Sequence, residues 1–168
     1  MRIIAGEPTK FTKADRETFV RLVRLGDEVA TGALKQNVEN AEALVFLKEE
    51  GLIRGIAALK LPQESYRERI GKKTKFNLGD TEFPYELGYI FIVEEARNQG
   101  WSRRLVKKAI ECALGSAIFA TIRTDNDPML RSLRSLGFEA AGEPYQGRNM
   151  KHLQVYVSKA NPTVKTRD

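Results

Sequence analysis

The sequence predicts an α/β domain in which strands and helices alternate along the chain. Apolar residues recur at strand spacing in some segments and at helix spacing in others, and no segment repeats another. The 168 residues suit one domain with a single core, and 42% apolar with 30% charged residues is the composition of a soluble globular protein. We expect this domain to span residues 1–157, followed by a polar tail at 158–168.

The first part of the chain has three predicted strands and two predicted helices. In order, these are a strand at 2–5, helices at 14–25 and 27–38, and strands at 43–48 and 53–61. Phe19 and Leu22 fall on one face of the first helix. The turn Glu49-Glu50-Gly51 favours a hairpin between the last two strands.

A long connection with a weak pattern follows at residues 62–84. It contains several turn formers, a short predicted helix at 64–70, and the basic residues Lys72, Lys73 and Lys75. Long connections of this kind are often functional. One hypothesis gives this segment a role in substrate recognition through its lysines, and the alternative is a solvated, uninvolved loop.

The last part of the chain returns to a clear alternation. In order, its elements are a strand at 85–93, a helix at 101–114, a strand at 117–123, a helix that ends at Gly137, and strands at 138–141 and 153–157. The first of these strands is almost continuously apolar, which is typical of a central strand covered on both faces. Gly115 is placed to end a helix, and Asp127 and Pro128 are predicted as the N-cap and first residue of the next.

The turn between the strand at 85–93 and the next helix carries the strongest functional signal. Its spacing is Arg97-x-x-Gly100-x-Ser102. A small-residue turn of this kind leaves backbone N–H groups at the positive end of a helix, where they can bind a phosphate or pyrophosphate. The spacing is neither the dinucleotide pattern G-x-G-x-x-G nor an ATP-binding loop, which would need Gly-Lys-Ser/Thr.

This turn resembles the acyl-CoA loop of the GCN5-related N-acetyltransferase (GNAT) family, whose pattern is Arg/Gln-x-x-Gly-x-Gly/Ala. A second family landmark reads Asn-x-x-Ala-x-x-x-Tyr-x-x-x-Gly-Phe. At that spacing this chain has Asn126, Met129, Leu133, Gly137 and Phe138. In addition, Glu86 lies eleven residues before Arg97, as does the general-base glutamate of histone-type members. The resemblance implies a mixed, mostly antiparallel sheet flanked by helices.

The resemblance also implies that acetyl-CoA is the cosubstrate and that an acetyl group passes to a primary amine by direct attack. The positions that it assigns to acetyl-CoA are Phe91, Ile92, Arg97, Asn98, Gln99, Gly100, Trp101, Ser102, Arg103 and Asn126. Backbone groups of Phe91 and Ile92 would pair with the pantetheine arm and polarise the thioester carbonyl. Ser102 departs from the family's Gly or Ala, and Asn126 could instead belong to an ordinary helix-start turn.

Two positions are assigned to catalysis. Glu86 is the predicted general base, and Gly88 on the same strand face would leave open space for the amine. The alternative is that Glu86 only begins the strand and faces solvent. Leu133 occupies the position of the tyrosine that protonates the leaving thiolate in many members, so Tyr145 becomes a candidate acid. The alternative for Tyr145 is a surface-loop tyrosine.

Composition narrows the setting of the protein. One cysteine, Cys112, allows no internal disulfide and favours a reducing compartment, so we expect a cytoplasmic protein. No apolar leader and no run long enough for a membrane span are present, so no membrane association is expected. His152 is the sole histidine and has no Cys/His cluster around it, so no metal is expected.

The acceptor is not identified by the sequence, and it could be a small molecule or a protein. The formal charge of +6 is spread along the chain and would suit CoA phosphates or an acidic partner. Two other functions stay open. The leucine at 133 would suit a catalytically silent CoA-binding regulatory module. The positive charge would suit a nucleic-acid-associated acyltransferase that acts on a charged tRNA or a DNA-bound partner.

Overall fold

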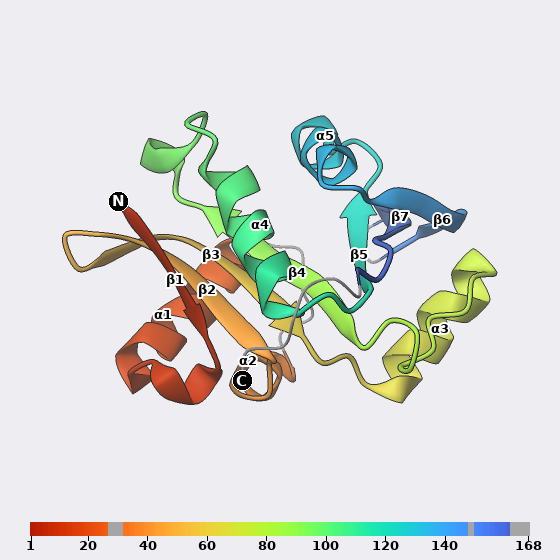
Figure 1. The fold of residues 1–168 in the computed structure, drawn as a ribbon, viewed down its shortest axis with the longest axis horizontal. Helices are drawn as coiled ribbons and strands as arrows, with labels where there is room; N and C mark the ends of the chain where they lie inside the picture. Colours follow the sequence, from red (N-terminus) through yellow and green to blue (C-terminus); the bar gives the residue numbers. More distant parts are fainter. Residues whose placement is uncertain (27–31, 148–149, 162–168) are drawn as a thin grey trace. The chain divides into compact units, whose positions relative to one another are not determined.

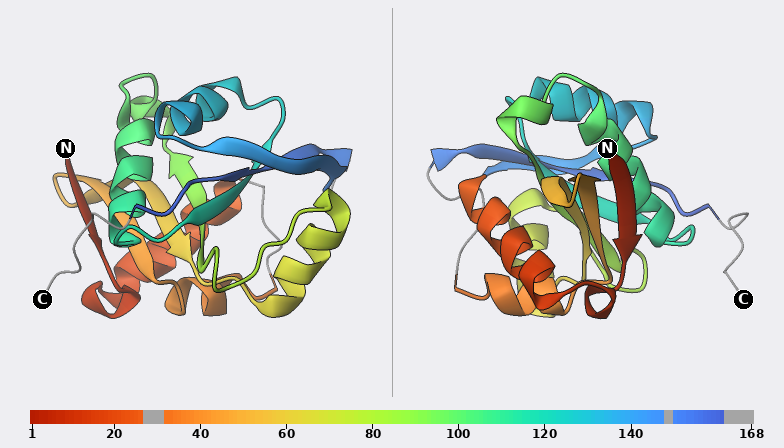
Figure 2. Two further views of the ribbon diagram at one scale, coloured as in Figure 1. Left: turned by 45° about the vertical axis from the view of Figure 1, so that its right-hand side comes forward. Right: turned by 90° about the vertical axis from the view of Figure 1, so that its left-hand side faces the viewer.

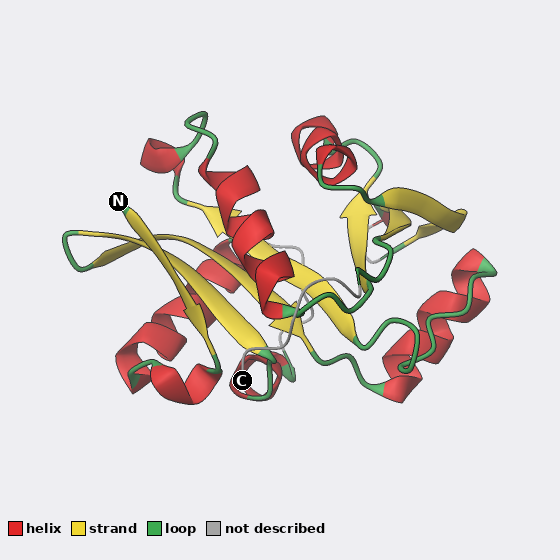
Figure 3. Ribbon diagram, in the orientation of Figure 1, coloured by secondary structure: helices red, strands yellow, loops and turns green. Residues whose placement is uncertain are grey.

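The computed structural model describes residues 1–26, 32–147 and 150–161, and it confirms the predicted α/β class (Figures 1 and 3). The strands are β1 (Arg2–Gly6), β2 (Ala43–Glu49), β3 (Leu52–Lys60), β4 (Tyr85–Ile92), β5 (Ile118–Arg123), β6 (Glu139–Gln146) and β7 (His152–Val157). The helices are α1 (Lys13–Leu25), α2 (Leu34–Glu39), α3 (Glu64–Thr74), α4 (Trp101–Cys112) and α5 (Asp127–Ser135), with short 3₁₀ turns η1 (Pro8–Lys10) and η2 (Glu94–Ala96).

The strands form a mixed, mostly antiparallel sheet, as the resemblance implied. Their hydrogen-bonded order is β1-β2-β3-β4-β5-β7-β6. The pairs β1/β2, β2/β3, β5/β7 and β6/β7 are antiparallel, whereas β4/β5 is parallel. The chain divides into two compact units, the first made of residues 1–61 and 87–112 and the second of 62–86 and 113–168. Strand β4 contributes its first two residues to the second unit and the rest to the first.

In the first unit, helices cover both faces of β1–β3. Helices α1 and α2 pack on one face and α4 on the other (Figure 2). On the α1 side, the rings of Phe19 and Phe46 meet edge to face with centroids 5.5 Å apart. On the α4 side, a Cβ at Gly55 would lie 3.1 Å from Cδ1 of Leu105. The glycine therefore allows α4 to approach the strand closely.

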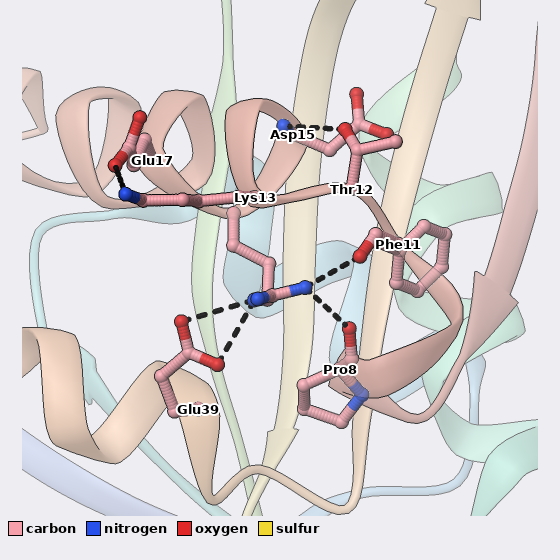
Figure 4. Close-up of polar contacts among 8 residues, drawn as sticks. Pro8, Phe11, Thr12, Lys13, Asp15, Glu17 and Glu39 are labelled. Carbon is pink, nitrogen blue, oxygen red and sulfur yellow. Dashed lines mark hydrogen bonds and ion pairs between the residues drawn. The ribbon is translucent and has the colours of Figure 1, made fainter.

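Side-chain contacts hold the start of α1 in place (Figure 4). The Thr12 hydroxyl accepts the Asp15 N–H at 3.1 Å and caps the helix. The Asp15 carboxylate pairs with Lys48 of β2 at 2.7 Å. Burial alone would raise the pKa of Asp15, but the hydrogen bond and charge of Lys48 outweigh burial and lower it. The next residue, Arg16, pairs with Glu39 of α2.

In the second unit, one buried arginine organises the connection between β3 and β4. Arg67 of α3 is 7% exposed, and its guanidinium donates to four backbone carbonyls. The acceptors are the carbonyl oxygens of Pro62, Leu78, Phe83 and Pro84. The connection at 62–84, whose sequence pattern is weak, is therefore held around the Arg67 guanidinium. The N–H donors of this cation are satisfied by backbone carbonyl oxygens.

Helix α3 packs closely on β6 at Gly142. This residue has φ of +67°, and a Cβ built on it would collide with the carbonyl oxygen of Thr74, the last residue of α3. Only glycine both adopts this backbone conformation readily and leaves room for the helix end. The contact places α3 against the strand that carries Tyr145.

Most predicted elements are confirmed, but several boundaries were wrong, among them the ends of α4 at Cys112 and of α5 at Ser135, each two residues earlier than predicted. Helix α3 continues to Thr74 instead of ending at residue 70. Strand β6 continues to Gln146, because an irregularity in its pairing with β7 between Ala141 and Tyr145 absorbs the turn-forming residues there. The N-cap of α5 is Asn126 instead of Asp127, which is already helical.

The helix predicted at 27–38 and the tail predicted at 158–168 each include residues outside the described ranges. Of the helix predicted at 27–38, residues 27–31 lie outside the described residues, and α2 occupies 34–39. The tail expected from residue 158 begins with ordered pairing, because the Ser158 N–H donates to the Ile118 carbonyl at 2.9 Å and the Asn161 N–H to the Gly115 carbonyl at 2.7 Å. Residues 162–168 lie outside the described residues.

Candidate active site

Glu86 is buried near the start of β4, within the second unit. Its side chain belongs to a residue only 2% exposed, so the interpretation that it faces solvent is wrong. Its Oε1 accepts a hydrogen bond from the Tyr66 hydroxyl of α3 at 2.9 Å and another from the Thr121 hydroxyl of β5 at 2.9 Å. Parallel pairing of β4 with β5, which aligns Glu86 with Phe119, brings Thr121 within reach.

Tyr145 lies on β6 in the same unit and is 8% exposed. The alternative of a surface-loop tyrosine is therefore wrong. Burial raises the pKa of Tyr145, the negative charge of Glu86 raises it further, and Arg69 and a hydrogen bond with Thr121 oppose the rise. Burial and the Glu86 charge also raise the pKa of Tyr66. Both phenols therefore stay protonated near neutral pH and are available as hydrogen-bond donors.

We call Glu86, Tyr66, Thr121 and Tyr145 the Glu86 cluster. It presents a buried carboxylate with one oxygen held by two hydroxyl donors, an arrangement that can accept a proton from a nearby amine. Sequence reasoning found Glu86 and Tyr145 but missed Tyr66 and Thr121. No sequence spacing links positions 66, 86 and 121. The sequence does place Tyr66 one turn before Ile70 on the apolar face of a predicted helix, which indicates that the tyrosine is partly buried.

The turn at 97–102, which is predicted to bind a phosphate, lies in the first unit. Asn98 and Gly100 have φ of +60° and +76°, and among the described atoms nothing lies within 4 Å of a Cβ placed on Gly100. The Gly100 carbonyl accepts the Arg104 N–H at 3.4 Å, which starts α4. The first turn of any helix leaves N–H donors without partners in the helix, so the loop suits a diphosphate.

Several side chains of this turn brace it. The Arg97 Nε donates to the Ile92 carbonyl at 3.0 Å, and the Gln99 amide donates to the Glu95 carbonyl at 3.3 Å. The Trp101 indole N–H donates to the Gln99 side chain at 3.3 Å. These contacts stabilise the conformation of the turn. Ser102 and Arg103 follow on the first turn of α4, half-buried and exposed respectively.

The middle of β4 differs from the prediction. Tyr89 has φ of +54°, so the strand is not extended there and side chains do not alternate strictly from Glu86 to Ile92. The expectation of open space at Gly88 is also wrong. A Cβ on Gly88 would lie 3.0 Å from Cδ of Lys60, whose ammonium lies 4.8 Å from the centroid of the Tyr89 ring.

The remaining predicted positions have clear structural settings. The Phe91 side chain is half-buried and that of Ile92 is buried, and the roles proposed for their backbone groups stay predictions. The Asn126 side chain accepts the Met129 N–H at 3.3 Å and caps α5, which confirms the helix-start interpretation. Its contact with the cosubstrate stays a prediction. Leu133 is fully buried, so this position provides packing and no acid.

Within the ranges 1–26, 32–147 and 150–161, no three His, Cys, Asp or Glu side chains are grouped so that they could hold a metal ion. Over the same ranges, no helix has both the length and the apolar character needed to cross a membrane.

Comparison with known structures supports the fold. The chain is similar to a ribosomal-protein-alanine N-acetyltransferase from Brucella melitensis, with a TM-score of 0.67 at 20% identity over 95% of this chain and 99% of the other. It is also similar to yncA from Salmonella typhimurium, solved with acetyl-CoA, with a TM-score of 0.68 at 15% identity over 99% of both chains.

Comparison of sequences reaches shorter stretches of curated proteins. The chain is 35% identical over 60 residues to the N-alpha-acetyltransferase RimI of Mycobacterium tuberculosis, a match to 36% of this chain and 38% of RimI. It is 38% identical over 66 residues to an uncharacterized protein of Mycobacterium leprae, covering 39% of this chain and 18% of that protein. The chain thus spans well under half the length of the curated relatives it matches.

The family model for the Acetyltransferase (GNAT) family matches residues 11–138, which include the Glu86 carboxylate, the turn at 97–102 and helix α5. The match covers most of the chain and agrees with the mixed seven-strand sheet and its helices. Together with the likeness in fold to the structures above, this match shows the family: the chain belongs to the Acetyltransferase (GNAT) family.

Proposed function

We propose that this protein transfers an acetyl group from acetyl-CoA to a primary amine by direct attack, with Glu86 as the general base. The observation that carries the proposal is the buried carboxylate of Glu86, whose Oε1 is held by Tyr66 and Thr121. An amine reaches the reaction as an ammonium ion and must lose a proton before it can attack. A carboxylate fixed in one orientation supports that proton transfer, directly or through one water.

In the proposed reaction, the proton of the ammonium passes to Glu86. The free nitrogen then forms a bond to the thioester carbonyl carbon, the carbon–sulfur bond breaks so that CoA leaves as a thiolate, and the nitrogen loses its second proton to solvent to give the neutral amide. A backbone N–H at Phe91 or Ile92 is the proposed donor to the carbonyl oxygen. The turn at 97–102 is proposed to bind the diphosphate of CoA through backbone N–H groups, with Arg103 and Asn126 as further contacts.

The proton that the thiolate takes up has two possible sources. Tyr145 is the candidate acid on this chain, and its hydroxyl is protonated because its pKa is raised. An ordinary thiol has a pKa of about 8.5, so the thiolate is a weaker base than a phenolate of raised pKa. Proton transfer from Tyr145 to the thiolate is thus uphill. We therefore propose that solvent supplies most of the protonation and that Tyr145 acts as a secondary donor.

The setting of the reaction is also a proposal. The relative named an N-alpha-acetyltransferase supports a protein α-amine as one acceptor class, beside small-molecule amines. We propose a cytoplasmic enzyme whose residues 1–157 form one domain.

Two alternative functions predict different results. A silent CoA-binding module would bind acetyl-CoA but acetylate no amine. An acyltransferase acting on nucleic-acid-bound substrates would show salt-sensitive binding to nucleic acid.

Binding of acetyl-CoA is tested by Gly100→Asp. The aspartate adds a side chain at positive φ and a negative charge where the diphosphate is proposed to lie, so we expect calorimetry to show no binding. Gly51→Asp is the matched control, because Gly51 also has positive φ, with no described atom within 4 Å of its Cβ, but lies in the β2–β3 turn. Equal affinity in a folded Gly100→Asp variant and in the wild type would contradict the proposed binding site.

A further inference from the structure

Helix α3 has two faces with different surroundings, both within the second unit. Tyr66 and Ile70 pack in the same core cluster as Tyr145 and so face the Glu86 cluster. The other face lines an open groove together with the segment at 76–80. The α3 residues that line this groove are Glu64, Arg67, Glu68, Gly71 and Lys72.

The groove face of α3 carries charges of both signs, because Arg67 and Lys72 line the groove as well. Both acidic residues of the helix, Glu64 and Glu68, line the groove. Beside the Glu86 cluster are two cations, Arg69 and Lys73. The Arg69 guanidinium lies 5.4 Å from the centroid of the Tyr66 ring, and the Lys73 ammonium lies 5.7 Å from the centroid of the Tyr145 ring. Each cation is therefore placed over one of the two tyrosines of the cluster.

This arrangement refines the hypothesis that Lys72, Lys73 and Lys75 act together. Lys72 lines the groove, and Lys75 pairs with Glu143 of β6 at 2.8 Å. Of the three lysines, Lys73 alone contacts a residue of the Glu86 cluster, and sequence reasoning missed its neighbour Arg69, one turn earlier. The recognition hypothesis for the 62–84 connection therefore narrows to two residues on one helix face.

Arg69 and Lys73 are both exposed, and within the described part of the chain neither pairs with a carboxylate. Arg69 contacts the Tyr66 ring, and Lys73 contacts the Tyr145 ring and the Gln146 carbonyl, the latter at 3.4 Å. Like charges four residues apart work against helix stability. A bound anion would offset this cost, and a guanidinium beside an ammonium suits a carboxylate.

We propose that the acceptor is an amine whose own molecule carries a carboxylate close to the nitrogen, and that Arg69 and Lys73 bind this carboxylate. The inference rests on the proposed acetyl transfer and names the substrate class for it. The two cations would repel a purely cationic amine and attract an anionic group. The carboxylate of the acceptor would thus be held by α3 while its ammonium meets Glu86.

The test compares amines of matched shape that carry or lack this carboxylate, each at a pH where the two amines have the same free fraction. The probes are α-amino acids and their carboxamides, and short peptides that begin with Asp or with Asn, with release of the CoA thiol as the readout. We expect kcat/KM to favour the carboxylate member of a pair by about tenfold or more, since hydrogen bonds to a charged group have at least that effect. The amino acids and the peptides distinguish a free amino acid from an acidic N-terminus as the source of the carboxylate.

The double variant Arg69→Gln/Lys73→Gln assigns the preference to these residues. We expect KM for the carboxylate acceptor to rise about tenfold or more, with kcat for the neutral amides and the affinity for acetyl-CoA unchanged. Lys72→Gln is the matched control, because it removes one lysine from the other face of the same helix. A charge-reversed variant, Arg69→Glu/Lys73→Glu, should shift the preference toward cationic amines.

The possible failures are distinguishable. If neutral or cationic amines are the better acceptors of the wild type, or if the glutamine double variant keeps the preference for carboxylates, the inference is overturned while acetyl transfer stands. If acetyl-CoA binds and no amine in the panel is acetylated, the proposed transfer is overturned, and this inference with it.

Discussion

Glu86 combines burial with a fixed orientation at the scale of single residues. Two hydroxyl groups from separate elements, α3 and β5, donate to the same carboxylate oxygen. A carboxylate in water samples many rotamers, whereas this one is held before any substrate binds. Fixed orientation of an acid or base is how proteins turn a weak interaction into catalysis.

Replacement of this carboxylate gives the central test of the chemistry. Glu86→Gln keeps the shape and much of the hydrogen bonding but removes the proton acceptor, so we expect kcat to fall by about 10²- to 10⁴-fold near neutral pH, with weaker dependence on pH. Steady-state rates with the best acceptor measure the effect. Tyr145→Phe serves as the comparison and should lower kcat much less, because solvent can protonate the thiolate. Full activity of Glu86→Gln across the pH range would show that the base lies elsewhere.

At the scale of elements, the contact between α3 and β6 is controlled by one residue. Gly142 has positive φ and leaves no room for a Cβ against the carbonyl of Thr74. The same contact sets the distance between the helix that carries Tyr66 and the strand that carries Tyr145. The geometry of the Glu86 cluster therefore depends on a residue that is not part of it.

Gly142→Ala is expected to destabilise the protein by about 1–3 kcal/mol through backbone strain, and further through the collision with Thr74. Gly51→Ala separates the two effects, because Gly51 shares the positive φ but has no described atom within 4 Å of its Cβ. Urea unfolding of both variants gives the two differences in free energy. An equal decrease in the free energy of unfolding in the two variants would show that the close approach of α3 to Gly142 does not affect stability.

At the scale of the whole molecule, β4 is the strand that enters both compact units. Tyr85 and Glu86 pair with β5 in the second unit, and the strand then continues into the first. Each unit therefore contains part of β4. This continuity supports the proposal that residues 1–157 form one domain, although the chain separates into two units by its contacts.

If residues 1–157 form one domain, we expect the protein to unfold in a single cooperative transition. Trp101 is the sole tryptophan and lies in the first unit, so its fluorescence reports on that unit, whereas far-UV circular dichroism reports on both. In urea the two signals should give coincident curves with one midpoint. Two separated midpoints would mean that the units unfold independently, and residues 1–157 would then not behave as one domain.

The sequence by itself determined the features that depend on neighbouring residues. The α/β alternation, the positions of most helices and strands, and the turn at 97–102 follow from local periodicity, from capping residues and from a glycine at positive φ. The importance of Glu86 followed from its spacing to Arg97 through the family resemblance. Such signals act over a few residues, so they survive without knowledge of the fold.

Tertiary structure alone decided which distant residues meet. The partners of Glu86 come from α3 and β5, and their meeting depends on strand pairing and on the packing of α3. Tyr145 is buried because β6 continues past an irregularity in its pairing with β7. The space beside Gly88 is filled by the side chain of Lys60 from β3. Register and packing join positions far apart in the chain. For that reason no local pattern could place Tyr66 beside Glu86 or Arg69 beside Tyr66.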